Sequence, residues 1–158
     1  MPAAGDATEA GNGEIMAQAS TPNSSRPRHP ATVGEIMEPA LTTAHATDHI
    51  AAAAYLMKHA GTTALVVLDA ETDRPVGIVT DTDVAHAVAD GKNVNEVRIS
   101  EVMTPEPTVV GTACSLREAA ELMTKGHFRH LPVVGDSGLA GIVDISTVSL
   151  ALLGPGDR

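Results

Sequence analysis

The sequence predicts an α/β (α+β) fold made of two tandem β-α-β-β-α repeats. The first observation behind this prediction is that VGEIMEP, at Val33–Pro39, recurs as ISEVMTP at Ile99–Pro105. The second is that the apolar positions after each motif match at a constant offset, interrupted only by a turn that is shorter in the second copy. Because turns tolerate changes of length, this pattern indicates a duplicated structural unit.

The second copy contains the clearer helix signal. Its apolar stripe, at the spacing of one helix face, consists of Leu116, Ala119, Ala120 and Met123. Ser115 and Glu118, three residues apart, predict a capping box at the start of the helix, and Gly126 predicts its end. These signals together predict a helix of about three turns.

The first copy carries the same helix in a less distinct form. Its apolar stripe consists of Ile50, Ala54 and Met57. Thr47 or Asp48 is the expected N-cap, and Gly61 is the expected end. Each copy is therefore expected to place one amphipathic helix after its opening strand.

Two short apolar runs follow each helix, LVVL with PVGIV in the first copy and LPVV with LAGIV in the second. A polar turn separates the members of each pair, which is typical of an antiparallel hairpin. A final short helix is expected from Asp81 towards Gly91 and from Ser146 towards Gly154. The expected domains are a first repeat over residues 32–92 and a second over residues 98–154. Residues 1–31 are expected to form a flexible tail, because they contain too little apolar surface to fold.

The composition argues against several classes of function. The 158 residues carry a formal net charge of −10, which repels nucleic acid and anionic lipid surfaces, and the chain has no Trp for base stacking. No apolar stretch is long enough for a membrane span and no secretory signal is present, so we expect a cytoplasmic protein. The single cysteine, Cys114, cannot form an internal disulfide.

The order of these motifs resembles a known family. An I/V-M-x-P segment precedes each β-α-β-β-α unit, and R-H-L-P-V-V and G-I-V-T-D-T-D fall on its strands. Together they are similar to the cystathionine-β-synthase (CBS) domain, and two in tandem are similar to a CBS pair, or Bateman module. The resemblance covers about Thr32 to Leu153. It implies a regulatory module with pseudo-two-fold symmetry that forms a homodimer and binds AMP, ATP or a related adenosine ligand between its repeats.

The segment GIVTDTD, at Gly77–Asp83, is the first candidate ligand corner. Thr80 ends the expected strand, and Asp83 follows on the first helical turn, where unpaired backbone N–H groups attract anions. The resemblance implies that Asp83 binds the ribose and that Thr80 binds the ribose or a phosphate. The alternative is that Thr80 and Asp81 only cap the helix, which would explain one of the two polar residues.

The resemblance also implies the remainder of the pocket. Adenine would lie against residues 62–65, and the strand around Leu41–Thr43 would close the pocket. The expected ligand-binding residues here are Thr42, Thr62, Ala64 and Leu65. Arg129 and His130 are the candidates for phosphate recognition. Because basic residues are scarce, we expect adenosine or AMP in preference to ATP.

The segment GIVDIST, at Gly141–Thr147, is the matching corner of the second repeat, and it departs from the family pattern. Asp144 stands where the family has Ser or Thr, and Thr147 stands where it has the ribose-binding Asp. A carboxylate about 4 Å from a phosphate would cost up to about 4 kcal/mol at an effective dielectric constant near 20. We therefore expect a degenerate second site, at which Asp144 or Ser146 caps a helix.

Two functions of different classes remain open. The first is a regulatory sensor that binds an adenosine nucleotide and signals through its dimer surface to an unknown protein partner. The alternative is a dimerisation or interaction module that binds no nucleotide. We expect neither an enzyme nor a cofactor: Cys114 precedes a helix, where the dipole lowers a thiol pKa, but no catalytic base accompanies it. A zinc site is not expected either, since His45 and His49 lack further ligands.

Overall fold

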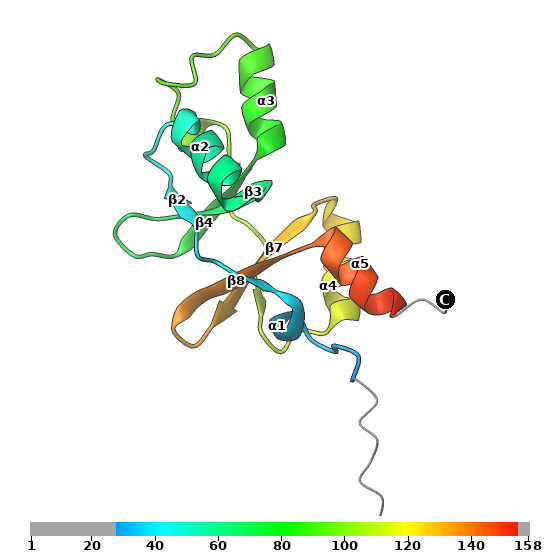
Figure 1. Cartoon of the computed structure of the whole chain (residues 1–158). Helices are drawn as coiled ribbons and strands as arrows, with labels where there is room; N and C mark the ends of the chain where they lie inside the picture. Colours follow the sequence, from blue (N-terminus) through cyan, green and yellow to red (C-terminus); the bar gives the residue numbers. More distant parts are fainter. Residues whose placement is uncertain (1–27, 155–158) are drawn as a thin grey trace, which may run out of the picture.

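The computed structural model describes residues 28–154 of the chain. The predicted flexible tail, residues 1–31, therefore lies almost entirely outside the described residues. The described part forms two lobes, one for each repeat, and each lobe contains a four-stranded sheet covered by helices (Figure 1). The predicted α+β fold is confirmed.

The first lobe follows the predicted β-α-β-β-α order. Its elements are β2 (Thr43–His45), α2 (Ile50–Ala60), β3 (Ala64–Leu68), β4 (Pro75–Thr80) and α3 (Asp81–Ala89). Strands β2 and β3 are parallel, so α2 forms the crossover between them, whereas β3 and β4 form the predicted antiparallel hairpin. With β5 added, the sheet has the order β2-β3-β4-β5.

The second lobe repeats this arrangement. Its elements are β6 (Val110–Gly111), α4 (Leu116–Gly126), β7 (His130–Gly135), β8 (Gly138–Asp144) and α5 (Ile145–Leu153). Strands β6 and β7 are parallel, and β7 and β8 form an antiparallel hairpin. The sheet order is β1-β8-β7-β6, so the two sheets correspond strand by strand.

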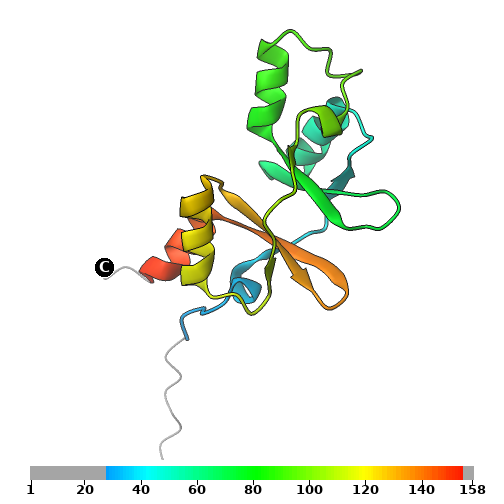
Figure 2. The same ribbon diagram turned by 180° about the vertical axis from the view of Figure 1, so that it is seen from behind.

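The segment before each repeat completes the sheet of the other repeat. Helix α1 (Val33–Ile36) and strand β1 (Glu38–Pro39) precede the first repeat, yet β1 pairs with β8 in the second lobe. The 3₁₀ helix η1 (Ile99–Glu101) and strand β5 (Thr104–Pro105) precede the second repeat, yet β5 pairs with β4 in the first lobe. Figure 1 shows α1 in the lobe that contains α4 and α5, and Figure 2 shows the same arrangement from behind.

Glycine is required where these segments cross the hairpins. A Cβ atom at Gly141 would overlap the carbonyl oxygen of Glu38, and one at Gly77 would overlap the thioether of Met103. The glycine of each GIV strand thus allows the crossing segment to approach the sheet. Met37 and Met103 are partly buried against the two cores, where their flexible side chains fill space.

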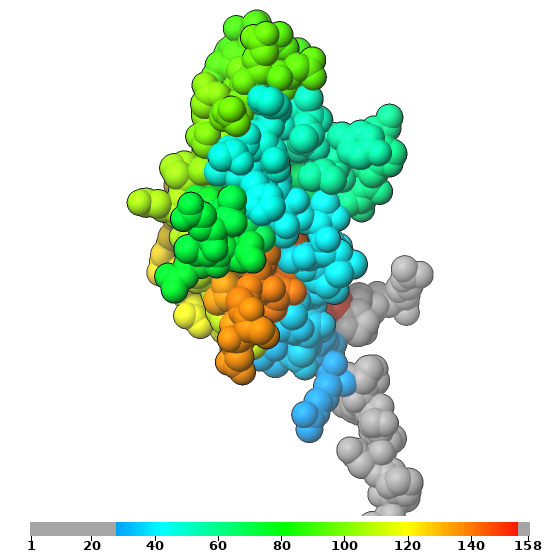
Figure 3. Space-filling model, turned by 90° about the vertical axis from the view of Figure 1, so that its left-hand side faces the viewer, coloured from blue at the N-terminus to red at the C-terminus, as the bar shows by residue number. Residues whose placement is uncertain are grey.

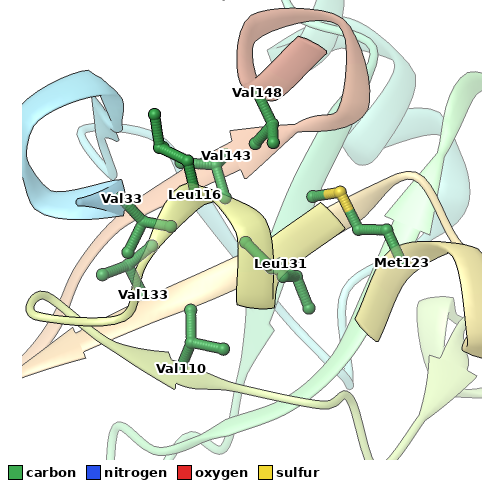
Figure 4. Close-up of a cluster of buried hydrophobic side chains, with 9 residues drawn as sticks. Val33, Val110, Leu116, Met123, Leu131, Val133, Val143 and Val148 are labelled. Atoms are coloured by element: carbon green, nitrogen blue, oxygen red, sulfur yellow. The ribbon is translucent and has the colours of Figure 1, made fainter. Parts of the chain in front are cut away.

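Each lobe has its own apolar core. The core of the second lobe, drawn in Figure 4, consists of Val33, Val110, Leu116, Ala119, Met123, Leu131, Val133, Val143 and Val148. The core of the first lobe consists of Ala44, Ile50, Ala53, Met57, Leu65, Val67, Val79, Ala87 and Ile99. Val33 and Ile99 are fully buried, and each lies in the core of the repeat that it does not precede. Each core is therefore completed by a residue from the other repeat's leading segment.

Helix α2 begins differently from the sequence prediction. Its N-cap is His49, which makes no side-chain capping bond. The predicted cap Asp48 instead accepts a hydrogen bond from the backbone N–H of His45, at 2.9 Å. The N–H of Ile50 donates to the carbonyl oxygen of Val97 at 3.0 Å. The segment after α3 therefore satisfies the start of α2, and no local sequence signal could reveal this.

The end of α2 and both ends of α4 were also predicted from the sequence. Gly61 ends α2 in the left-handed conformation, with φ of 68°. Ser115 caps α4 by accepting a hydrogen bond from the third helical N–H at 3.1 Å. The predicted capping box is incomplete, because the side chain of Glu118 does not accept a hydrogen bond from the N–H of Ser115. Gly126, however, is the last residue of α4, and His127 takes the left-handed φ of 54°. A Cβ atom at position 126 would overlap the ring of Phe128, so a larger residue there would require the ring to move.

Candidate ligand site

A cavity of about 360 Å³ lies where the first repeat meets the segment that crosses to the second repeat. It is lined by Glu38, Pro39, Ala40, Leu41, Thr42, Ala60, Thr62, Ala64, Val66 and Ile142. This lining is mainly apolar, with two threonine hydroxyls and one carboxylate. Both its size and its lining are typical of a small-molecule site, for which volumes of about 300–1,000 Å³ are usual.

Three predicted ligand residues, Thr42, Thr62 and Ala64, line this cavity. Leu65 does not, because its side chain is buried in the core of the first lobe. Alternation along β3 explains the difference, since Ala64 and Val66 face the cavity and the residue between them faces the opposite side. Leu65 therefore packs in the core of the first lobe and does not line the cavity.

Thr80 and Asp83 form a reciprocal capping box at the start of α3. Asp83 Oδ2 accepts hydrogen bonds from the N–H and the hydroxyl of Thr80, at 2.8 and 3.0 Å. The N–H of Asp83 donates in return to Thr80 Oγ1 at 3.2 Å. Capping thus explains both polar residues, contrary to the expectation that it would explain only one. Thr80 is the cross-strand partner of Ala64, which lines the cavity, but neither Thr80 nor Asp83 belongs to the lining itself.

The two carboxylate oxygens of Asp83 differ in their surroundings. Oδ2 is held by Thr80, whereas Oδ1 accepts no hydrogen bond from any residue in the range 28–154. Asp83 is half-buried. The first corner therefore presents one fixed carboxylate oxygen with unused acceptor capacity.

The backbone N–H groups at the start of α3 are not free, contrary to the sequence expectation. That of Asp81 donates to the carbonyl oxygen of Thr63 at 3.0 Å, and that of Thr82 donates to Asp81 Oδ1 at 2.8 Å. The third belongs to Asp83 and donates to Thr80. A helix N-terminus binds an anion through unpaired N–H groups, and here the first three are satisfied within the protein.

The second corner is built as a helix cap. Asp144 is the N-cap of α5, as expected, and α5 begins at Ile145, one residue before the predicted start. Asp144 Oδ1 accepts the N–H of Thr147 at 2.9 Å, and Oδ2 accepts the hydroxyl of Thr147 at 3.0 Å. Both carboxylate oxygens are used, so this corner offers no counterpart of the unused oxygen of Asp83.

Arg129 and His130 lie where the two corners approach each other. His130 is the cross-strand partner of Asp144. Burial lowers the pKa of His130, the carboxylates of Asp144 and Asp81 raise it, and the guanidinium of Arg129 lowers it further. Because Asp81 begins α3 of the first repeat, the imidazole of His130 is within electrostatic range of the first corner. Neither Arg129 nor His130 lines the cavity.

Sequence reasoning missed the part of the lining that comes from the crossing segment. Glu38 and Pro39 belong to β1, and Ile142 belongs to β8 of the second repeat. The repeated I/V-M-x-P motif marked the position of this segment. Only the pairing of β1 with β8 shows that it borders the site.

A larger hollow, of about 800 Å³, lies between the turns of the two hairpins. Figure 3 shows these turns next to each other, green for the first repeat and orange for the second. The charged residues that line this hollow are Asp73, Arg74 and Glu106, and none of the predicted ligand residues lines it.

Two further observations concern the reactivity of Cys114 and metal binding. Burial and then the carboxylate of Glu118 raise the pKa of Cys114, the opposite of the effect expected at a helix start. Within residues 28–154, no three His, Cys, Asp or Glu side chains are placed to hold a metal ion. No helix of the described residues is long and apolar enough to cross a bilayer.

Comparison with known proteins agrees with this architecture. The sequence model of the CBS domain matches residues 33–90 and residues 99–154. An uncharacterized protein of Methanopyrus kandleri is 34% identical over 119 residues, which cover 74% of this chain and 60% of that protein. The chain thus spans less than two thirds of the length of this relative.

Two solved structures share the fold. One is a protein with CBS domains from Burkholderia ambifaria, with a TM-score of 0.71 and 30% identity, covering 80% of this chain and 97% of that chain. The other is CBSX2 from Arabidopsis thaliana in complex with AMP, with a TM-score of 0.62 and 30% identity, covering 78% of this chain and 97% of that chain. Since two CBS domains in tandem account for most of its length, this chain belongs to the CBS-domain family.

Proposed function

We propose that this protein is a regulatory CBS pair that binds an adenosine compound, adenosine or AMP rather than ATP, beside α3 of the first repeat. The observation that carries this proposal is the carboxylate of Asp83. Thr80 holds one of its oxygens, and the other accepts no hydrogen bond from residues 28–154. Thr80 is also the cross-strand partner of Ala64, which lines a cavity of about 360 Å³. An oxygen with unused acceptor capacity is suited to accept hydrogen bonds from the vicinal hydroxyls of a ribose.

The cavity supports the same ligand class. The adenine base would lie against Ala64 and the apolar side chains around it, with Thr42 and Thr62 at its edge. A related structure, that of CBSX2, was solved in complex with AMP. Three phosphates would require more cationic side chains than Arg129 supplies, since burial lowers the pKa of the neighbouring His130, and ATP is therefore the weakest candidate.

The regulatory signal would pass through a homodimer surface to a protein partner. Apolar side chains are exposed on the helices of the described residues: Leu150 and Leu153 of α5 are 71% and 81% exposed, and Val88 of α3 is 59% exposed. Exposed apolar groups on helices favour association between copies. Ligand binding next to α3 would act on this surface with a coupling free energy of about 1–3 kcal/mol, as is usual for allosteric proteins.

Isothermal titration calorimetry with adenosine, AMP and ATP tests the proposal. The wild-type protein should bind one ligand per chain, and Asp83→Ala should weaken binding at least tenfold. Ser115→Ala is the matched control, because it removes the N-cap of α4 in the second repeat and should leave ligand affinity unchanged. Circular dichroism would verify that both variants are folded. Wild-type affinity in Asp83→Ala would show that the assignment of this residue is wrong.

A dimerising interaction module without a nucleotide is the second candidate. The capping box favours it, because Thr80 and Asp83 have a complete structural role without any ligand. In this case none of the adenine compounds would produce heat. The chain would still sediment as a dimer in analytical ultracentrifugation, and Leu153→Glu would dissociate it.

A further inference from the structure

The hollow of about 800 Å³ between the two hairpin turns is built by both repeats. Residues 72–75 of the first turn and residues 137–139 of the second line it, on the face that Figure 3 turns to the viewer. Thr43 and Val109, from equivalent positions of the two repeats, contribute as well. The volume lies in the upper half of the range of about 300–1,000 Å³ that is usual for binding sites.

Apolar side chains supply a large part of the lining. Leu68, Val134 and Leu139 are partly buried, and Val109 is 42% exposed. The charged lining residues are exposed. A protein interface typically combines such an apolar centre with a polar rim. The hollow therefore offers apolar surface that a side chain of a partner could remove from water.

The charged side chains of the hollow have no partner among residues 28–154. Asp73, Arg74 and Glu106 make neither an ion pair nor a side-chain hydrogen bond in this range. The first turn does not need the carboxylate of Asp73, because Asp69 accepts the N–H groups of residues 71 and 72, both at 2.9 Å. Glu106 has a φ of 50°, a conformation that is uncommon for residues other than glycine, asparagine and aspartate. Local structure therefore explains neither carboxylate.

The charge around the hollow is predominantly negative. The turns comprise residues 69–75 and 135–138, and Arg74 is their only basic residue. Besides Asp73, their acidic residues are Asp69, Glu71 and Asp136. A surface rich in carboxylates attracts cationic segments and repels anionic ones. Charge complementarity therefore favours a basic partner.

The hollow and the ligand cavity share one short segment of chain. Ala40 lines both of them, Thr42 lines the cavity and Thr43 lines the hollow. A molecule in the cavity and a molecule in the hollow would therefore contact the same segment. This placement suits a surface through which a regulatory module acts on another protein.

We propose that the hollow docks an extended basic segment of a partner protein, in which an apolar side chain is flanked by lysine or arginine. The apolar side chain packs against Leu68, Val109 and Val134, and the cationic groups pair with Asp73 and Glu106. Arg74 donates to a carbonyl oxygen of the docked segment. This inference goes beyond the proposed function, because it concerns a second surface and docking requires no nucleotide.

Phage display of random dodecapeptides on the immobilised full chain, without nucleotide, tests this inference. The enriched peptides should combine lysine or arginine with apolar residues. Fluorescence anisotropy with the labelled synthetic peptides then measures affinity. Glu106→Lys should weaken binding at least tenfold, and Val109→Ser should weaken it at least threefold. Glu96→Lys is the matched control, because it makes the same change of charge at an exposed residue outside the hollow and should bind like the wild type.

The outcomes distinguish this inference from the proposed function. Enrichment of acidic peptides, or of none, overturns it. Equal affinity of Glu106→Lys and Glu96→Lys for the selected peptides also overturns it, because the peptides then bind elsewhere. Peptide affinity that falls as salt is raised supports the role of the exposed carboxylates. Since no nucleotide is present, a failure of adenosine and AMP to bind in calorimetry would overturn the proposed function and leave these results unchanged.

Discussion

The crossing of β1 over the second hairpin makes Gly141→Ala the most informative perturbation of the fold. The new Cβ atom would overlap the carbonyl oxygen of Glu38 and would lie 2.9 Å from the sulfur of Met37. A methionine side chain can change rotamer, but a backbone oxygen moves only if the strand moves. We therefore expect β1 to shift away from β8 in this variant.

The size of the effect follows from two opposing contributions. Overpacking a tightly packed site costs about 1–3 kcal/mol, and a contact with backbone belongs near the upper end of that range. Replacing glycine by alanine also restricts the unfolded chain, which stabilises the protein by about 0.4–1 kcal/mol. The free energy of unfolding of Gly141→Ala should therefore fall by about 2 kcal/mol.

Urea unfolding followed by circular dichroism measures this difference, with Gly135→Ala as the matched control. Gly135 lies on the neighbouring strand β7, and a Cβ atom there would meet only Ala140 at 3.7 Å and Thr112 at 3.9 Å, which are ordinary contacts. The control should match the wild type or exceed its stability by up to about 1 kcal/mol. Equal stability of the two variants would refute the reasoning that glycine is required by the crossing strand. Strand β1 also contains Glu38 and Pro39, which line the cavity. Of the two variants, only Gly141→Ala should therefore weaken ligand binding.

Three further predictions concern the core, a helix cap and pH. Ile99→Ala should lower the free energy of unfolding by about 2–5 kcal/mol, because this side chain is fully buried in the core of the other repeat, whereas the exposed Val88→Ala should have little effect in the same urea assay. Ser115→Ala should cost about 1 kcal/mol, since the cap of α4 is lost, and thermal unfolding that matches the wild type would contradict this role. Burial lowers the pKa of His130 below its ordinary 6.5, so the unfolded chain binds a proton more readily and the protein should lose stability as pH falls below about 6.5. Thermal unfolding of His130→Gln between about pH 7 and pH 5.5 should show a shallower loss, and parallel pH profiles would contradict the prediction.

The candidate site was only partly predictable from the sequence. Thr42, Thr62 and Ala64 were expected and do line the cavity, because the resemblance supplied their positions. Leu65 was expected as well, but the alternation of side chains along β3 turns it into the core. The sequence could not show that only one carboxylate oxygen of Asp83 accepts hydrogen bonds from Thr80, because this depends on the orientation of the side chain.

The sequence by itself determined the repeated β-α-β-β-α unit, the hairpins and the helix ends at Gly61 and Ser115. These features depend on residues within a few positions of each other, through side-chain periodicity, capping bonds and backbone conformation. Local patterns are therefore sufficient to predict them.

Only the tertiary structure decided which sheet each leading segment joins. Val33 and Ile99 have equivalent places in the repeat, and each is buried in the core of the other repeat. Pairing of β1 with β8 joins residues that are far apart in the chain, and it brings Glu38 and Ile142 to the edge of the cavity. The local sequence does not indicate this pairing. The contact arises from packing between two repeats, and the sequence patterns of the two repeats are nearly the same.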